Sequence, residues 1–281
     1  SFYSGMVPNY AFNLAMAIIF GILLLFNLIT FAIYRQYWFG TAFVIATFLE
    51  MLGYIGRTLS HSATNNMNDF LIQFICLTIA PVFTMGGIYY QLAKLGAVYG
   101  EHFSRLKPIY YSYVFVSCDI LSLVIQALGG GIAGTATAND ESNTTGTHVF
   151  VGGLALQVFS MAIFLCFMFD FLHAVYIRAK KDLPSPDEPL ESLYNPKYAY
   201  IRARPLFKYF NFAVTIATLF VFVRCIYRVV ELAEGWSGFL MTHETYFIIL
   251  DALMMSIATT IFVPFYPGFM FDGRHSTIPV S

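Results

Sequence analysis

The sequence predicts an all-α polytopic membrane protein with seven transmembrane helices, an N-terminus outside the cell and a C-terminus in the cytosol. Three observations support this prediction. Of the 281 residues, 58% are hydrophobic and only 11% are charged, a composition unlike that of a soluble domain. The apolar residues form segments long enough to cross the hydrocarbon core of a bilayer. The basic residues gather in alternate loops, as they do in membrane proteins of fixed orientation.

Seven apolar segments reach the length that a membrane-spanning helix needs. They are residues 12–34, 40–59, 70–97, 109–132, 148–176, 206–233 and 244–265. Together they indicate a single transmembrane domain over residues 1–281. The only substantial connection, about 178–205, holds five prolines and charges of both signs, so we expect it to be a mobile cytosolic linker between the fifth and sixth helices.

The distribution of Lys and Arg predicts the orientation, because cytosolic loops carry an excess of both. Twelve of the 15 lie in or beside the first, third and fifth loops or near the C-terminal end, and the other three lie within spans. The second, fourth and sixth loops have none. The sequon at Asn143 falls in the fourth loop, which this orientation places outside, where glycosylation can occur.

The sixth span carries charges where a membrane helix is expected to be apolar. Arg224, Arg228 and Glu231 are spaced i, i+4, i+7 and so share one helix face. Glu244 and Asp251, seven residues apart, share a face of the seventh span. A charge at the centre of a spanning helix costs roughly 2.5–3.5 kcal/mol on insertion scales. We therefore expect these groups to meet partners or water inside the bundle and to mark a functional site.

Other spans add polar groups that also recur seven residues apart. The second span holds Glu50 and Arg57, and the fourth holds Asp119 and Gln126. Gln157 lies in the outer half of the fifth span. Because these groups occupy the midplane and outer halves of their helices, they predict a polar chamber that opens outward above an apolar floor.

The predicted chamber holds two more acids than arginines. Such a surplus suits a cationic guest, or acids kept protonated by desolvation. Asp119 and Asp251 have no Arg or Lys one or two turns away on their own helix, so we expect these two acids to hold the cation. We expect the remaining charged groups of the second, sixth and seventh spans to form one connected network that also includes Asp251.

Two features predict irregular helix geometry. Pro81 removes a backbone hydrogen bond in the third span, so it should kink the helix, either as static packing or as a hinge. The triplet Gly129-Gly130-Gly131 should end or unwind the fourth helix at the outer face, followed by a small polar loop over residues 135–147.

Five motifs taken together resemble the fungal lipid-translocating exporter family. They are Glu50-x-x-Gly53-Tyr54-x-x-Arg57, Ala80-Pro81, Asp119-x6-Gln126-x-x-Gly129-Gly130-Gly131, Arg224-x-x-Tyr227-Arg228-x-x-Glu231 and Glu244-x6-Asp251. The set covers essentially all seven predicted helices. Residues 76–94 are most similar to the branch of sphingoid long-chain-base exporters. The resemblance implies a fungal protein of the plasma membrane, with membrane lipids as its partners, that moves sphingoid bases.

The leading hypothesis is a transporter or translocase that exports or flips sphingoid long-chain bases or a similar amphiphilic lipid. The ammonium group would suit the acid-rich chamber, and the alkyl tail would suit the Phe-rich helix surfaces or the surrounding lipid. The predicted substrate-binding residues are the polar members of the spans: Glu50, Arg57, Asp119, Gln126, Gln157, Arg224, Arg228, Glu231, Glu244 and Asp251. The sequence has no Walker-type glycine loop, so no ATPase of its own is expected.

Three alternatives remain open. Seven spans with an outside N-terminus also fit a lipid sensor or receptor. His61, His148 and His243 at the outer ends of spans could serve a porphyrin or haem transporter, or a zinc-dependent membrane lipid hydrolase. No spacing places two histidine ligands on one helix face, so we predict no metal, no cofactor, no catalytic residue and no enzyme activity. No basic stripe predicts nucleic-acid binding, and the sequence leaves the oligomeric state open.

Overall fold

The computed structural model describes residues 5–62, 64–105, 107–139, 142–181, 189–235, 238–271 and 278. Within these residues the regular structure is helical throughout, and six helices are long and apolar enough to cross a membrane. They are α1 (Tyr10–Tyr34), α2 (Tyr37–Leu59), α3 (Met67–Tyr99), α4 (Pro108–Ala138), α5 (Thr144–His173) and α8 (Phe207–Ala233). The prediction of an all-α polytopic membrane protein is confirmed.

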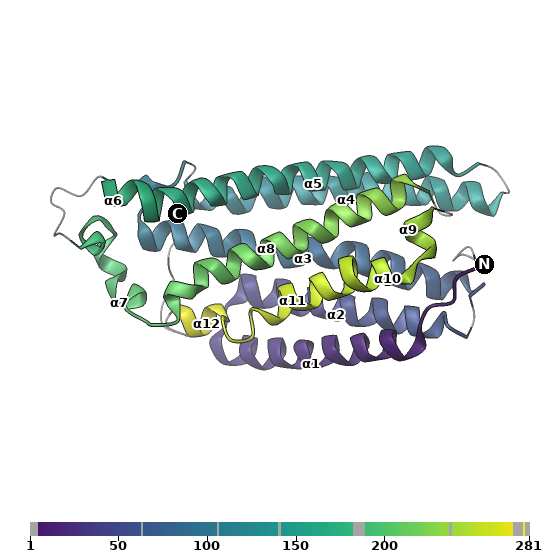
Figure 1. Ribbon diagram of the computed structural model, residues 1–281, viewed down its shortest axis with the longest axis horizontal. Helices are drawn as coiled ribbons and strands as arrows, with labels where there is room; N and C mark the ends of the chain where they lie inside the picture. The colour runs from purple at the N-terminus through teal and green to yellow at the C-terminus, as the bar shows by residue number, and fades with distance from the viewer. Residues whose placement is uncertain are drawn as a thin grey trace.

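The long helices lie side by side in an elongated bundle (Figure 1). Each of α1 to α5 packs on the next helix along the chain, and α8 returns to pack on α5 and α3. A C-terminal helical segment then packs on α8 and α1, which closes the bundle. We call the end at which α1 begins the N-terminal end of the bundle. Large apolar side chains such as Ile22 and Ile29 remain exposed on the outside of α1, as expected of a surface that faces lipid.

The predicted seventh span is helical but does not form one long α-helix. It consists of α10 (Glu244–Phe247), the π-helical η5 (Ile248–Leu253) and α11 (Met254–Thr260), which follow one another without a gap. A π-helical turn interrupts the regular α-helical hydrogen bonds and is common at functional sites. The prediction that this segment crosses the membrane as a seventh helix therefore stays a prediction.

The described part of the predicted linker is folded against the end of α3. Helix α5 continues through the π-helical η2 (Ala174–Arg178) into α6 (Ala179–Lys181). Further along are η3 (Leu190–Leu193), η4 (Pro196–Tyr198) and α7 (Ala199–Arg202). The backbone N–H of Asn195 donates to the carbonyl of Tyr99 at 3.1 Å, and buried Arg202 donates to the carbonyl of Asn195 at 2.8 Å.

Tyr194 fixes the same segment from the other side. Its phenol hydroxyl donates to the carbonyl of Val175 at 2.9 Å, and burial raises the pKa of this phenol to about 12. The prediction of a mobile linker is therefore wrong for residues 189–205, because buried side chains attach them to the bundle. Residues 182–188 lie outside the described residues.

Helix α4 continues through its glycine triplet to Ala138, so the prediction that the triplet ends the helix is wrong. The glycines serve close packing between α4 and α5 instead. A Cβ on Gly129 would lie 2.3 Å from the backbone nitrogen of Phe150, and one on Gly146 would lie 2.2 Å from that of Ala133. Only glycine permits this approach of two backbones. The connection shortens to residues 139–143, of which 140 and 141 lie outside the described residues.

The predicted hinge and glycosylation residues have defined positions. Pro81 is buried within α3, which runs on as one helix on both sides of it. Asn143 immediately precedes α5 and is half-buried. Whether Pro81 bends during function and whether Asn143 carries a glycan both stay predictions. The remaining short helices are η1 (Glu101–Phe103), α9 (Phe239–Thr242) and α12 (Pro267–Met270).

Candidate functional site

The charged face of α8 points into the bundle. Arg224, Arg228 and Glu231 are each at most 7% exposed, on a helix that packs against α3, α5 and the C-terminal segment. The i, i+4, i+7 spacing therefore places these three side chains on one buried face, as predicted.

Asp251 joins the two arginines of this face. Its Oδ1 lies 3.1 Å from Nε of Arg224, and its Oδ2 lies 3.7 Å from Nε of Arg228. Arg228 also pairs with Glu231, at 2.6 Å between Nη1 and Oε2. Asp251 thus has two arginine partners, as expected of a member of the charged network, and its predicted role in holding a cation stays a prediction. Because η5 lies against α8, the partners of Asp251 come from another helix and not from its own.

Glu50 has the fewest partners of the buried acids around these arginines. Its Oε1 lies 4.0 Å from Nη2 of Arg224, which also donates to the carbonyl of Leu77. Among the described residues, neither carboxylate oxygen of Glu50 has a hydrogen-bond partner, and the same holds for the hydroxyl of Tyr54 one turn away. Both oxygens of Glu50 can therefore still accept a hydrogen bond. Leaving a buried carboxylate without donors is costly.

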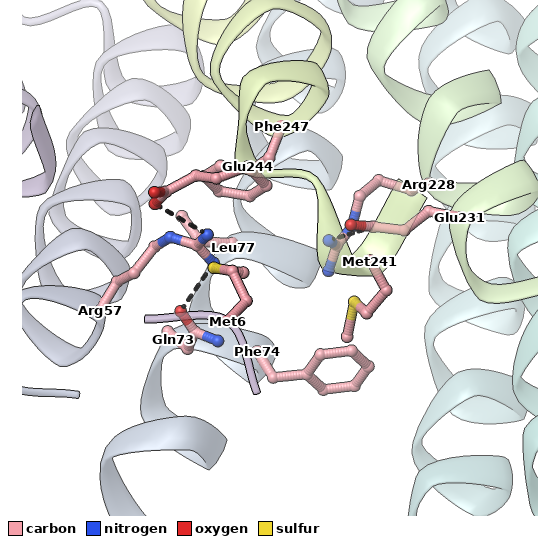
Figure 2. A pocket seen from close by; sticks show the side chains of 10 residues that line it. All are labelled: Met6, Arg57, Gln73, Phe74, Leu77, Arg228, Glu231, Met241, Glu244 and Phe247. Carbon is pink, nitrogen blue, oxygen red and sulfur yellow. Dashed lines mark hydrogen bonds and ion pairs between the residues drawn. The ribbon is translucent and has the colours of Figure 1, made fainter. Parts of the chain in front are cut away.

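Arg57 and Glu244 form a second charged group at the N-terminal end of the bundle. Nη2 of Arg57 lies 3.2 Å from Oε1 of Glu244, and Nη1 lies 3.3 Å from the amide oxygen of Gln73. The guanidinium also stacks on Phe247, with 3.9 Å between its carbon and the ring centroid. Glu244 further accepts the backbone N–H of Asn9 at 2.9 Å. This group lies opposite the Arg228–Glu231 pair (Figure 2).

The predicted single network is thus divided into two groups that face each other across a cavity. We call this cavity the polar chamber. It is lined by Met6, Arg57, Gln73, Phe74, Leu77, Arg228, Glu231, Met241, Glu244 and Phe247 (Figure 2). Its volume of about 20 Å³ leaves room for about one water molecule. The chamber as described therefore accommodates a single small polar group.

Three predicted site residues lie elsewhere. Asp119 accepts the hydroxyl hydrogen of Tyr89 at 2.9 Å, and its other oxygen has no partner among the described residues. Gln126 donates from Nε2 to Oε1 of Gln157 at 3.1 Å, which links α4 to α5. None of the three lines the polar chamber. Of the other seven, Arg57, Arg228, Glu231 and Glu244 line the chamber. Ion pairs connect Asp251, Arg224 and Glu50 to Arg228.

The seven charged residues around and behind the polar chamber include more carboxylates than guanidinium groups. Glu50, Glu231, Glu244 and Asp251 supply four carboxylates, while Arg57, Arg224 and Arg228 supply three guanidinium groups. With all of them ionised, the set carries one negative charge in excess. The four charged residues that line the polar chamber, Arg57, Arg228, Glu231 and Glu244, balance one another, and the excess carboxylate is that of Glu50 behind Arg224.

Several chamber residues are absent from the predicted site, and so is Tyr227, which contacts the chamber residue Glu231. Gln73 supplies the amide oxygen that Arg57 contacts, and Tyr227 donates its hydroxyl to Glu231 at 2.9 Å. A lone amide in an otherwise apolar stretch of the third span was a usable signal for Gln73. Nothing in the local pattern marked Phe74 or Phe247, because aromatic residues are frequent along the whole chain.

The described residues contain no group of three or more His, Cys, Asp or Glu side chains that could hold a metal ion. Glu244 instead directs its carboxylate at Arg57 and at the backbone of Asn9.

Comparison with known proteins gives a consistent result over the whole chain. The family model described as "RTA1 like protein" matches residues 43–274. The protein named "Sphingoid long-chain base transporter RSB1" of Saccharomyces cerevisiae strain Lalvin EC1118 is 52% identical, over 100% of this chain and 77% of the relative. Its counterpart in strain S288c is 51% identical over the same shares.

A more distant relative is "Protein RTA1" of Saccharomyces cerevisiae strain S288c. It is 26% identical over 80% of this chain and 64% of the relative. No solved structure matches the chain.

Proposed function

Because the chain belongs to the RTA1-like protein family, we propose that it exports or flips sphingoid long-chain bases across the fungal plasma membrane. One observation carries this proposal: the chain is 51–52% identical, over its whole length, to relatives named as sphingoid long-chain base transporters. The same names support transport over the receptor, porphyrin-transport and hydrolase hypotheses. They also suggest that the chain is not an enzyme.

The chemistry of the polar chamber supports the proposal. A sphingoid base has a cationic ammonium group and hydroxyls at one end and a single long alkyl chain. A primary ammonium is close to water in size, so it fits the space between Glu231 and Glu244. Its charge would balance the carboxylate that the wider buried set, with Glu50 included, holds in excess of its arginines. Hydrogen bonds between ionised partners are roughly twice as strong as neutral ones, so the chamber would favour the charged head over a neutral one.

The test is the movement of labelled sphingoid base in liposomes that contain the purified protein. We expect the protein to accelerate transfer of the base from the membrane to an external acceptor. The N-acetylated base has the same chain and no positive charge. Its transfer rate should be at most about one tenth of that of the charged base, as a loss of about 1.4 kcal/mol would cause. Equal rates for the two lipids, or no acceleration of either, would reject the proposal.

A variant pair assigns the effect to the chamber. Glu231→Gln should slow transfer of the charged base, because it removes one of the two carboxylates that line the chamber. Glu234→Gln is the matched control, since Glu234 lies one turn further along, is exposed and does not line the chamber. Size-exclusion chromatography of both variants should show that each is folded before the rates are compared.

A further inference from the structure

A second and much larger cavity lies on the side of the bundle. It runs between α3 and α4 and is closed at its base by Phe150 of α5 and Leu232 of α8. Its volume is about 890 Å³, within the range of small-molecule sites. The wall is mostly apolar, with side chains such as Phe70, Ile75 and Val124. We call this cavity the apolar groove.

The apolar groove and the polar chamber share a wall. Phe74 lines both cavities, and its ring centroid lies 5.7 Å from the guanidinium carbon of Arg228. On α8 the neighbouring residues Glu231 and Leu232 line the chamber and the groove respectively. Figure 2 shows the Phe74 ring among the residues of the polar chamber, near Met241 and Arg228. Phe74 and the adjoining turns of α3 and α8 therefore form the wall between a charged cavity and an apolar one.

The groove has the length of a lipid chain. Its residues on α4 extend from Ile120 to Thr135, which at 1.5 Å per residue is about 22 Å. One leaflet of the hydrocarbon core is about 15 Å thick, half of about 30 Å. An extended alkyl chain that spans one leaflet therefore fits along the groove.

Two further details favour a ligand over helix packing alone. A Cβ on Gly131 or Gly134 would meet nothing within 4 Å, so these groove glycines do not serve a close helix contact. Gln126 also lines the groove, is 2% exposed, and has no hydrogen-bond donor for its Oε1 among the described residues. A hydroxyl group on a bound amphiphile would supply that donor.

We propose that the apolar groove binds the alkyl chain of the transported sphingoid base while its ammonium occupies the polar chamber, with the ring of Phe74 turned aside so that one molecule reaches both. This assignment rests on the function proposed above and adds the site and the shape of the substrate to it. A cation with one chain matches one carboxylate in excess across the buried charged set and one apolar groove. A diacyl phospholipid fits neither, since it would bring a phosphate toward Glu231 and carries a second chain.

Filling the groove tests the assignment. Gly134→Leu places a branched side chain in the groove, and Gly152→Leu is the matched control. Gly152 is a helical glycine of α5 that is equally open to a Cβ and does not line the groove. We expect Gly134→Leu to slow the transfer of a long-chain sphingoid base about tenfold, a typical effect of a changed carbon count in an apolar site. Transfer of a short-chain base should stay within about twofold of the unmodified protein.

The comparison of chain lengths separates the two proposals. If the unmodified protein moves neither base, the proposed function fails. If it moves both and Gly134→Leu moves the long-chain base as fast as Gly152→Leu does, transport stands and the groove assignment is wrong. Equal slowing of both bases by Gly134→Leu would also overturn the assignment, because it would show a general disturbance.

Photocrosslinking gives a second measurement on the unmodified protein. A long-chain sphingoid base with a diazirine at the end of its chain should label groove residues of α3 and α4. Unlabelled long-chain base should compete for this labelling, whereas unlabelled phosphatidylcholine should not. Labelling spread over the lipid-facing side of α1, or equal competition by the phospholipid, would refute the assignment.

Discussion

Asp251 is the residue on which the buried charges depend most. It is fully buried and contacts both Arg224 and Arg228. Asp251→Asn would leave two buried arginines with weaker compensation, and breaking a buried ion pair costs about 3–5 kcal/mol. We expect a clear fall in the apparent midpoint of thermal unfolding and in the yield of monodisperse protein. Both can be measured on the purified protein in detergent.

Asp119→Asn is the control for this prediction. It makes the same chemical change at a buried position, but Asp119 contacts the hydroxyl of Tyr89 and no arginine. Asparagine can still accept that hydrogen bond, so stability should change by about 1 kcal/mol or less. An Asp119 variant as unstable as the Asp251 variant would contradict the structure's separation of these two acids.

For single residues, the sequence predicted which helix face each charged side chain occupies but not which side chains form ion pairs with it. The spacing on the sixth span correctly placed Arg224, Arg228 and Glu231 on one buried face. It could not show that Asp251 meets both arginines, because that contact depends on how two helices rotate against each other. The π-helical turn adds to the difficulty, since an extra residue in a turn rotates every following side chain.

Helices α4 and α5 pack most closely where a glycine of one helix meets the backbone of the other, as at Gly129 and Gly146. An alanine at Gly129 would place its Cβ 2.3 Å from a backbone nitrogen of α5, where no side-chain rotation relieves the overlap. We expect Gly129→Ala to push the helices apart and to destabilise the protein by about 1–3 kcal/mol, as overpacking does. The apparent midpoint of thermal unfolding measures this.

Gly152→Ala is the matched substitution. The new Cβ would meet nothing within 4 Å, and alanine is favoured over glycine in a helix by about 1 kcal/mol. Its unfolding midpoint should therefore stay level or rise slightly. A similar fall in both variants would mean that loss of glycine itself, and not the contact with Phe150, is responsible.

The glycine triplet also shows the limit of local patterns. Three consecutive glycines favour the end of a helix in isolation, yet α4 continues past them. Packing against α5 and the lack of water to bond exposed backbone groups both favour the continuous helix. Packing against α5 outweighs the low helix propensity of glycine here, and this packing cannot be read from a single sequence.

For the whole molecule, the six long helices follow directly from the length and polarity of their segments. The predicted seventh span has the expected composition, but its regular α-helix is broken into two short pieces by η5. Hydropathy indicates how long an apolar segment is, but not whether its backbone forms a regular α-helix or a π-helical turn. The predicted linker failed for a related reason, because the burial of Tyr194 and Arg202 depends on contacts with distant residues.

The orientation of the bundle is the prediction that decides how the two cavities are placed in the cell membrane. The polar chamber and the α4–α5 connection lie at the N-terminal end of the bundle, and residues 189–205 lie at the other end (Figure 1). Because basic residues concentrate at that other end, we expect it to face the cytosol and the chamber to face outside. An exporter with this orientation would collect its substrate from the membrane and release it outward.

Cysteine labelling of intact cells tests this orientation. Ser142→Cys and Lys197→Cys both introduce an exposed thiol, one near each end of the bundle. A membrane-impermeant maleimide should label the cysteine at position 142 in intact cells and the one at position 197 only after permeabilisation. The parent chain, whose native cysteines lie within the helices, gives the background. The opposite pattern would place the chamber on the cytosolic side, and the chain would then take up sphingoid bases into the chamber from inside the cell.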